Sequence, residues 1–489
     1  MLSKDQIELI VQQTLAQMTN PGAAAAPAPA PAAPAAAPAA PAPVYAEVKG
    51  DGGWMFDSAE VCIEKAAEAQ KQLIAMGMKK RYEIVEAMRK AAHANADMLG
   101  RMAREETGYG RNEHKIAKIH LAADKTPGPE DVVAEVYTGD RGMTLVEQAP
   151  FGVIGSITPS TNPPSTVVNN CISMISAGNA VVFNPHPAAL KVSQAAMRVM
   201  HEAIVSVGGP AGLVCCPTNP NMETSAVIMS HPKVKLLSIT GGEGVVKVAM
   251  KSGKKAICAG PGNPPVIVDE TADIVKAGRD IVEGASFDNN ILCIAEKEGY
   301  FVNSIFDQLM AEMQRNGAWL IRGEDIDKIV NTVLIPQDGK HVINRKFVGH
   351  DATYIMDAAG VYYTGNPVLI IAEVPNHHPF VETEMLMPVL GCVRCADVNQ
   401  AIDWAVEAEH ECWHSAIMHS TNYLNMTKAA KALNTTIFTK NAPSTAALGV
   451  NSEGFTTLTI ATPTGEGLTR ARTFTRARRC VLEDGFRII

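Results

Sequence analysis

The sequence predicts an α/β protein in which helices cover parallel sheets and two hydrophobic cores are buried. The 489-residue chain is 46% hydrophobic and 19% charged. Because single cores stop growing near ~250 residues, a chain of this length can bury at least two. After about residue 135, short apolar runs alternate with segments of helical period. Such alternation is typical of right-handed βαβ crossovers and a parallel sheet.

The first 48 residues stand apart from this pattern. Residues 1–18 are expected to form a short helix, since Ser3 and Gln6 have the spacing of a capping box and apolar residues recur on one face. Those apolar residues are Ile7, Ile10, Val11, Leu15 and Met18. Residues 19–48, nearly all alanine and proline, are expected to be a semi-rigid spacer. A lone helix of this length is marginal in water, so we expect its apolar face to dock on another protein; the alternative is a disordered terminus that happens to be amphipathic.

Residues 49–262 are expected to form the first domain. Helical patterns fill about residues 54–135, in the stretches SAEVCIEKAAEAQKQLI and KKRYEIVEAMRKAAHANADMLGRMAREETG. Short strands are predicted after them at FGVIGSITPS, AVVFNPH, GLVCCPT and VKLLSITGG, with helical stretches between. As a class, this is a nucleotide-binding architecture.

A second α/β domain is expected over residues 263–455, beginning near PPVIVDETADIVKAGRDIVEGA. Residues 456–489 are predicted to contain strands exposed for pairing with another subunit, together with a segment at about 137–150. We therefore expect a homodimer or homotetramer. The arginines between Arg470 and Arg479 either belong to such an interface strand or face the phosphates of a ligand.

Polar and glycine residues follow two of the predicted strands. In SITGGEGVV, Gly241, Gly242 and Gly244 stand where a strand turns into a helix, so backbone N–H groups there can meet a phosphate, although glycines at strand ends are commonly only turn residues. In TPSTNPPSTVVNN, Asn162 precedes a helix that begins with proline. Its carboxamide is expected at the carboxyl edge of the sheet, where open α/β sheets bind ligands; the alternative is a helix cap or turn residue.

Cys293 lies between a polar turn and an apolar run in SFDNNILCIAEKEGYFV, and is either a core residue or a nucleophile. Together with Asn162, the glycine turn and Glu384 in VETEMLMPV, it resembles the aldehyde dehydrogenase superfamily in order and spacing, from about residue 50 to the end. The stretches SFDNNILCIAEKE, GPGNPPVIVDETAD, AIMHS and TPTGEGLTRARTF resemble the branch of coenzyme A-acylating aldehyde dehydrogenases of bacterial microcompartments, which act in propanediol and ethanolamine degradation.

The resemblance implies a Rossmann-type parallel-sheet cofactor domain, a second α/β catalytic domain and a small β oligomerisation arm. It also makes Cys293 the nucleophile, which needs partial exposure and a stabilised thiolate. The Cys293 N–H and the Asn162 carboxamide would hold the oxyanion, and hydride would pass to NAD, leaving a thioester. Glu384 would orient the nicotinamide ribose. The remaining residues implied to bind the cofactor are Thr158, Pro159, Ser160, Asn184, His186, Pro187, Thr240, Gly241 and Gly242.

Two departures from the superfamily pattern are informative. Hydrolytic members carry a glutamate that activates water, but here ICAGPGNPP places Ala259 and Gly260 near its position. Without that general base, attack by the thiol of coenzyme A is favoured over hydrolysis. Hydrolytic members also have Lys and Glu for the adenosine ribose where FNPHPAA stands here, so the ribose must be recognised differently. No arginine is placed for a 2′-phosphate, which favours NAD over NADP.

The preferred function is therefore oxidation of a short-chain aldehyde to acyl-coenzyme A with NAD, with propionaldehyde favoured and acetaldehyde as the second candidate. The alternatives are a hydrolytic enzyme that gives free acid and a non-catalytic scaffold that binds shell proteins. Cys392 and Cys395 form a lone C-x-x-C pair, and His410, Cys412, His414 and His419 do not have metal-site spacing. We interpret these residues as packing or channel residues, and no metal is expected.

Charge and targeting patterns limit the partners. The formal net charge is −8, which favours neither nucleic acid nor anionic lipid. Residues 1–20 lack a secretory signal, and no apolar run approaches the ~18 residues that a membrane span needs. The ten cysteines fit free thiols in a reducing cytoplasm. By resemblance, residues 1–18 are an encapsulation peptide that docks on a shell or cargo protein, which predicts a location within a bacterial microcompartment.

Overall fold

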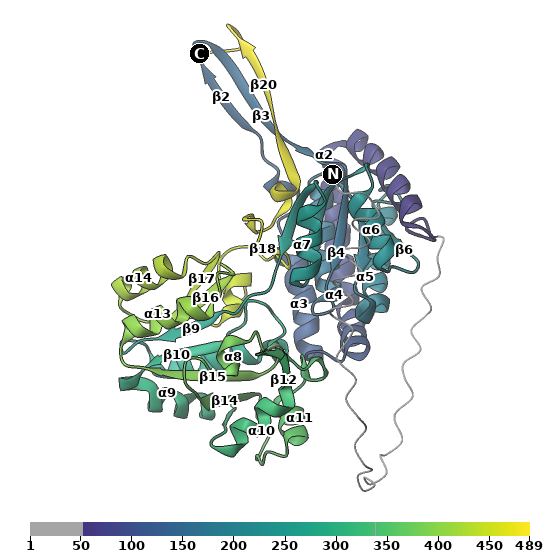
Figure 1. The fold of residues 1–489 in the computed structure, drawn as a ribbon. Helices are drawn as coiled ribbons and strands as arrows, with labels where there is room; N and C mark the ends of the chain where they lie inside the picture. Colours follow the sequence, from purple (N-terminus) through teal and green to yellow (C-terminus); the bar gives the residue numbers. More distant parts are fainter. Residues whose placement is uncertain (1–51, 338) are drawn as a thin grey trace.

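The computed structural model describes residues 52–337 and 339–489. Figure 1 shows two halves, each built on a sheet, and a slender arm that projects from the first half. The expected helix over residues 1–18 and the spacer over residues 19–48 lie outside the described residues, so both stay predictions. No helix in the described part of the chain has the length and apolar content to cross a membrane.

The first sheet is parallel throughout and contains all four strands predicted after residue 150. In spatial order its strands are β1 (Met55–Phe56), β6 (Val214–Pro217), β5 (Ala180–Pro185), β4 (Val153–Thr158), β7 (Val234–Thr240) and β8 (Lys255–Ala259). The strands are nearly continuous runs of buried apolar residues, because helices cover both faces of the sheet.

The helices of this half follow the periodic segments of the sequence. They are α2 (Ala59–Thr107), α3 (Asn112–Lys125), α4 (Pro163–Ser176), α5 (Leu190–Ser206), α6 (Met222–Ser230) and α7 (Glu243–Lys251). Helix α2 contacts α3, α4 and α5, while α6 and α7 contact β7. Ser58 caps the start of α2, its hydroxyl accepting from the Val61 N–H, and Gly108 ends that helix in a left-handed conformation.

The second sheet is also parallel and begins just beyond the expected domain boundary at residue 262. Its spatial order is β11 (Ala318–Leu320), β14 (Leu369–Glu373), β15 (Val389–Cys395), β10 (Glu298–Val302), β9 (Pro265–Val268), β16 (Ser415–His419) and β17 (Ile437–Lys440). Adjacent residues pack into different cores on its two faces: Ile267 and Tyr300 on one, Val266 and Phe301 on the other. This alternation is that of a strand buried on both sides.

The helices of the second half are α8 (Ile274–Ser286), α9 (Asn303–Arg315), α10 (Glu324–Val333), α11 (Ala352–Ala359), α12 (Pro379–Glu382), α13 (Val398–Ala408) and α14 (Tyr423–Leu433). A short hairpin is formed by β12 (Leu334–Gln337) and β13 (Lys340–Ile343). The Cys392 and Cys395 side chains are buried in the cores on the two faces of β15, which agrees with their interpretation as packing residues.

The arm is an antiparallel sheet of β2 (Glu135–Gly139), β3 (Gly142–Pro150) and β20 (Thr475–Glu483), with β3 in the centre. The two segments predicted to be interface strands therefore pair with each other within one chain. Two further short strands of the tail, β18 (Ile460–Ala461) and β19 (Gly467–Leu468), pair with each other. Ala461 and Phe474 are buried in the core of the first half, so the tail is anchored there.

Candidate active site

The predicted site residues come from two facing edges of the sheets. Asn162 follows β4, and Thr240 ends β7, so both lie at the carboxyl edge of the first sheet. Cys293 precedes β10 and therefore lies at the amino edge of the second sheet. A hydrogen-bonded chain from Asn162 through Lys118 to Asp288 joins the two edges. The site is thus assembled between the two halves.

Cys293 is half-buried, unlike most cysteines of the described chain, which are buried. Its side chain packs against a small apolar cluster that includes Leu292, Ile294 and Leu448. Partial exposure is what a nucleophile needs. Burial and the nearby Glu384 carboxylate raise the pKa of Cys293 to about 12, while Lys297 and the N–H groups of Cys293 and Ile294, which would stabilise a thiolate, act to lower it. The resting thiol is therefore protonated at neutral pH.

The turn before Cys293 has an unusual backbone. Asp288, Asn289 and Asn290 have φ values of 50°, 55° and 64°, in the left-handed region that Asn and Asp tolerate better than other side chains. The Asn290 Nδ2 donates to the carbonyls of Ala285, at 2.8 Å, and Glu296, at 2.9 Å. These bonds hold the turn in one conformation.

Lys297 supports the same turn from beneath. Its Nζ donates to the carbonyl of Asn290 at 2.7 Å and to that of Leu292 at 3.1 Å. Burial lowers the pKa of Lys297 to about 8, although Glu384 and Cys293 act to raise it. Lys297 is thus a positive group that acts on the Cys293 thiol and bonds the turn before it. Nothing in the local sequence pattern indicated this role.

Asn162 stands at the start of α4, before Pro163, as expected. Its side chain makes no capping hydrogen bond to the helix, so the reading of Asn162 as a simple cap loses support. The Asn162 Oδ1 accepts from the Nζ of Lys118, and the Nδ2 donates to the Thr161 Oγ1 at 3.2 Å. One N–H of the amide is left for another acceptor.

The glycine turn is open in the way that a phosphate site requires. Gly242 precedes α7, no side chain caps that helix, and a Cβ at Gly242 would meet nothing within 4 Å. The first N–H groups of α7 are therefore uncovered. Thr158 is buried with its hydroxyl unpartnered, while Thr240 shares a 3.0 Å hydrogen bond with Thr459. These features fit a dinucleotide at the carboxyl edge of the first sheet.

The other residues predicted to bind the cofactor differ in their exposure and in their hydrogen bonds within the protein. Pro159 and Ser160 are half-buried after β4, and Pro187 is exposed. The Asn184 carboxamide is engaged within the protein: its Oδ1 accepts from the Thr224 hydroxyl at 2.6 Å and its Nδ2 donates to the Asn221 carbonyl at 3.2 Å. The exposed His186 accepts from the Ala188 N–H at 3.1 Å.

Glu384 is brought close to the nucleophile. Burial raises its pKa, while Lys297 and the Gly262 N–H act to lower it, and its carboxylate acts on the Cys293 thiol. At the position of the missing hydrolytic glutamate, Ala259 is buried. A Cβ on Gly260 would lie 2.8 Å from the Pro463 ring, so a larger side chain at residue 260 would require Pro463 to move.

The histidines behind the site are packed rather than grouped around an ion. His414 and His419 are buried, and burial lowers the pKa of each to about 4. The His414 Nδ1 is 2.8 Å from the Ser415 hydroxyl. The exposed His410 contacts the Glu382 carbonyl at 3.1 Å, and Cys412 is half-buried. Across residues 52–337 and 339–489, no three His, Cys, Asp or Glu side chains are grouped so that they could hold a metal ion.

A cavity of about 750 Å³ opens beside the apolar cluster that contains Cys293. Its apolar wall is formed by Leu121, Phe287, Leu292 and Leu448, which also pack in the cluster that contains Cys293. Lys118 lines the same cavity. These wall residues come from distant segments, and no sequence motif pointed to Leu121, Phe287 or Leu448. The cavity therefore adjoins the cluster that contains Cys293 and the lysine that bonds Asn162.

Comparison with known proteins places this geometry in a family. The model described as "Aldehyde dehydrogenase family" matches residues 55–457. The acetaldehyde dehydrogenase (acetylating) EutE of Salmonella typhimurium is 47% identical over 89% of this chain and 93% of its own length. The propanal dehydrogenase (CoA-propanoylating) of Citrobacter freundii is 46% identical over 91% of this chain and 96% of its own length.

Solved structures agree. A propionaldehyde dehydrogenase from the Clostridium phytofermentans fucose utilisation bacterial microcompartment superposes with a TM-score of 0.87 at 47% identity, covering 89% of this chain and 99% of that one. The Rhodopseudomonas palustris propionaldehyde dehydrogenase with bound propionyl-CoA has a TM-score of 0.87 at 45% identity, over 88% of this chain and 96% of that one. With its half-exposed cysteine, amide donor and open glycine turn between two parallel sheets, this chain belongs to the aldehyde dehydrogenase family.

Proposed function

We propose that the protein oxidises a short-chain aldehyde to an acyl-coenzyme A, with a nicotinamide cofactor as hydride acceptor and coenzyme A as acyl acceptor. The observation that carries the proposal is the half-buried Cys293, whose turn is joined to the Asn162 amide through Asp288 and Lys118, with no carboxylate at residues 259 and 260. Relatives that are 45–48% identical over most of the chain are acetylating or CoA-propanoylating enzymes.

In the first half-reaction the Cys293 thiol releases its proton to solvent water and its sulfur attacks the aldehyde carbon. The Cys293 N–H and the free N–H of the Asn162 amide then hold the oxyanion, which is where negative charge develops in the transition state. Loss of hydride from the tetrahedral adduct leaves a thioester on Cys293. When bound, NAD supplies the acceptor for that hydride. Thr158, Thr240, Gly241, Gly242 and the start of α7 would hold its phosphates and nicotinamide, and Glu384 its ribose.

In the second half-reaction the sulfur of coenzyme A attacks the thioester carbon, the bond to the Cys293 sulfur breaks, and the proton given up by the coenzyme A thiol restores the Cys293 thiol. A thiolate is a far better nucleophile than water and needs less help from a base. The Glu384 carboxylate acts on the Cys293 thiol, and its raised pKa disfavours the ionised form that would activate water. Thiolysis is therefore favoured over hydrolysis.

The assay that decides between the two outcomes follows NADH, acyl-coenzyme A and free acid with and without coenzyme A. We expect acyl-coenzyme A to form in step with NADH. Without coenzyme A, only one NADH per active site is expected. Steady production of free acid without coenzyme A would instead identify the hydrolytic enzyme. Cys293→Ala should abolish NADH production and leave NAD binding intact; loss of NAD binding as well would mean that the variant is misfolded.

The relatives named as acetaldehyde and propanal dehydrogenases support a short alkyl chain on the aldehyde. We propose propionaldehyde as the preferred substrate, with acetaldehyde also used, because one methylene in an apolar pocket is worth only ~1–3 kcal/mol. Comparison of kcat/KM for acetaldehyde, propionaldehyde and butyraldehyde at saturating coenzyme A tests this choice. A maximum at butyraldehyde would contradict it.

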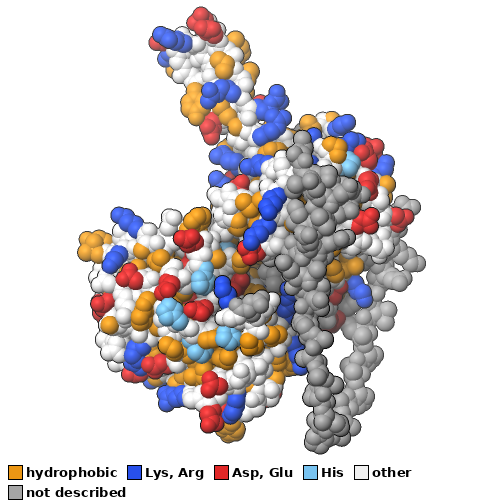
Figure 2. All heavy atoms as spheres, in the orientation of Figure 1, with side chains coloured by type: hydrophobic (Ala, Val, Ile, Leu, Met, Phe, Trp, Pro, Cys, Tyr) orange, Lys and Arg blue, Asp and Glu red, His pale blue; other side chains and the backbone are white. Residues whose placement is uncertain are grey.

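We propose that the arm is the site of self-association. Both outer strands, β2 and β20, present unpaired edges, which other strands can extend. Val136, Tyr137 and Val481 on them are 55%, 60% and 64% exposed, and Figure 2 shows hydrophobic and charged side chains interspersed along the arm. Tyr137→Lys together with Val481→Lys should shift a homodimer or homotetramer towards monomer in light scattering. An unchanged mass would place the interface elsewhere.

We also propose that residues 1–18 dock on a shell or cargo protein and locate the enzyme in a bacterial microcompartment. The support is the amphipathic pattern of that segment, the Ala/Pro spacer behind it, and a structural relative from such a compartment. A fluorescent protein fused to residues 1–20 should enter shells if this docking occurs.

A further inference from the structure

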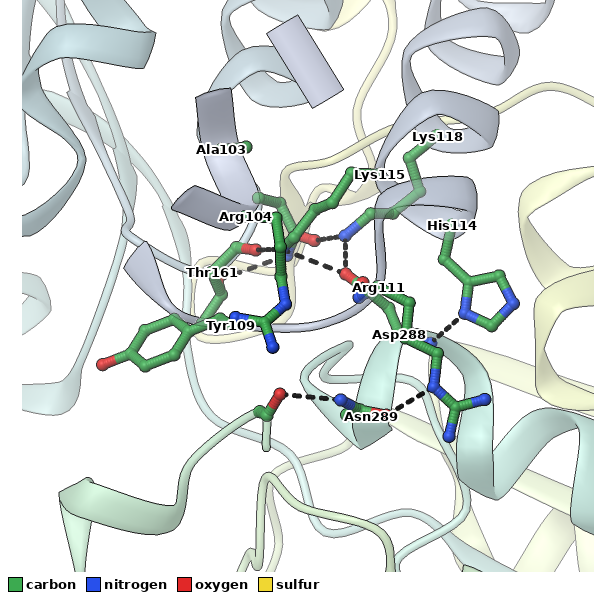
Figure 3. Close-up of polar contacts among 12 residues, drawn as sticks. Ala103, Arg104, Tyr109, Arg111, His114, Lys115, Lys118, Thr161, Asp288 and Asn289 are labelled. Carbon is green, nitrogen blue, oxygen red and sulfur yellow. Dashed lines mark hydrogen bonds and ion pairs between the residues drawn. The ribbon is translucent and has the colours of Figure 1, made fainter. Parts of the chain in front are cut away.

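The side chain of Lys118 lies beside Asp288, with the Lys115 side chain on the same carboxylate (Figure 3). It is only 2% exposed, and its Nζ donates to the Asn162 Oδ1 and to the Asp288 Oδ2. One turn earlier on α3, the Lys115 Nζ lies 3.1 Å from the same Asp288 oxygen and donates at 2.8 Å to the carbonyl of Thr161. Two buried lysines of one helix therefore contact the Asn162 loop and the Asp288 carboxylate together.

Asp288 is held from several sides. Its Oδ1 accepts from the Arg111 N–H at 2.9 Å, and its own N–H donates to the His114 Nδ1 at 2.8 Å. Burial acts to raise the Asp288 pKa, but Lys115, Lys118 and the Arg111 N–H hold it below its usual value. The carboxylate is thus ionised and immobile. It belongs to the turn that leads to Cys293.

The Asn162 amide has two orientations of similar shape but opposite polarity. Lys118 has only N–H donors, so it requires the Oδ1 on its side and turns the Nδ2 away from itself. The flipped orientation would place two donors against an ammonium and would direct the Oδ1 at the oxyanion. Lys118 also lines the cavity that has Leu121, Phe287, Leu292 and Leu448 on its wall, and these four residues pack in the cluster that contains Cys293.

We propose that Lys118 is a positioning residue: by bonding the Asn162 Oδ1 it directs the amide N–H at the aldehyde oxygen, and by pairing with Asp288 it ties that amide to the segment that carries Cys293. The inference rests on the proposed function. It adds that the oxyanion donor depends on a lysine from α3, which lies 44 residues from Asn162. The alternative is a purely structural role, in which Lys118 only neutralises the Asp288 carboxylate and stabilises the fold.

A double-mutant cycle separates the two roles. Asn162→Ala alone should lower kcat by ~10² or more, because one oxyanion donor is lost. Lys118→Met should lower kcat by ~10 to 10² and leave the KM for NAD unchanged. If Lys118 acts through Asn162, adding Lys118→Met to Asn162→Ala should change kcat less than threefold, since residues that act as a unit are not additive. If the two losses multiply, Lys118 does not act through Asn162 and the proposal is overturned.

Lys254→Met is the matched control. The Lys254 Nζ donates to the carbonyls of His231 and Val234 at 2.9 and 3.0 Å, away from the site, so its loss should lower the unfolding midpoint and leave kcat unchanged. If Lys118→Met does not fold, Lys118→Gln, which keeps an N–H donor, takes its place in the cycle and is judged by the same criterion. Failure of wild-type enzyme to form acyl-coenzyme A would refute the proposed function; an active wild type with unimpaired Lys118→Met would refute only the role of Lys118.

Discussion

Gly110 and Gly108 offer a pair of substitutions that isolates the Asp288 network. Both glycines have φ of +72°, so alanine at either position carries the same backbone strain. A Cβ on Gly108 would approach nothing closer than the His350 Nε2 at 4.0 Å. A Cβ on Gly110 would lie 1.9 Å from the Asp288 Oδ1 and 2.6 Å from its Cγ. Only the second alanine forces the carboxylate to move.

The expected magnitudes follow from these contacts. Alanine in the left-handed region costs about 1–2 kcal/mol, which is the whole effect expected for Gly108→Ala. Gly110→Ala should lose the same amount and, in addition, about 3–5 kcal/mol, because Asp288 must leave two buried lysines and the Arg111 N–H. The turn that carries Cys293 moves with Asp288, so kcat should fall as well. Gly108→Ala should leave kcat near the wild-type value.

The measurements are urea unfolding followed by fluorescence, and kcat with propionaldehyde at saturating NAD and coenzyme A. Wild type, Gly108→Ala and Gly110→Ala are compared at equal subunit concentration, because association contributes to apparent stability. Equal destabilisation by the two alanines would refute the reasoning. It would mean that Asp288 adjusts freely and that the network is not rigid.

Three further outcomes are expected. Because the Cys293 pKa is about 12, inactivation of the free enzyme by iodoacetamide should accelerate about tenfold per pH unit from pH 6 to 9; a plateau near pH 7 would show that the resting thiol is already ionised. In the folded protein burial lowers the pKa of His419 to about 4, below the ordinary 6.5. The unfolded chain therefore binds the proton more readily than the folded protein. The free energy of unfolding should fall as the pH drops from about 6.5 towards 4. Between pH 7 and 5 the free energy of unfolding should fall by about 2 kcal/mol through His419 alone. His419→Gln should therefore reduce the fall of the unfolding midpoint over that range. An identical fall in the variant would refute the lowered pKa of His419. Deletion of residues 1–45 should leave kcat and the unfolding midpoint unchanged and abolish encapsulation. A fluorescent protein fused to residues 1–20 should enter shells, and the same fusion with Leu15→Glu should not. Loss of activity on deletion, or entry of the Leu15→Glu fusion into shells, would contradict the docking role.

Much of the fold was predictable from local pattern. Alternating strands and helices predicted the parallel first sheet and the α/β character of the second half, and the strands ending at Thr158 and Thr240 were found where their apolar runs stop. The position of Asn162 before a proline-started helix was predicted correctly for the same reason: proline is favoured in the first helical turn. These features depend on near neighbours in the chain. Composition and period are sufficient to reveal them.

The chemical site was predictable only through motifs, and its electrostatics were not. The spacing of Cys293, Asn162 and Glu384 indicated a family and thus a nucleophile. The direction of the Cys293 pKa could not be read from the sequence: burial and the Glu384 charge raise it, against Lys297 and two N–H groups. A pKa depends on the groups that surround the atom in space. The order of residues along the chain does not state which groups those are.

The sequence by itself determined the alternation of strands and helices and, through a superfamily motif, the family and the candidate reacting residues, because hydrophobic period, turn residues and motifs are local signals. Only the tertiary structure decided that Lys118 and Asp288 join Asn162 to the Cys293 turn, and that Leu121, Phe287 and Leu448 form one cavity wall. It also decided that β3 and β20, at opposite ends of the chain, form one arm. These contacts connect residues far apart in sequence, and their partners are selected by how helices and sheets pack, which no local spacing records.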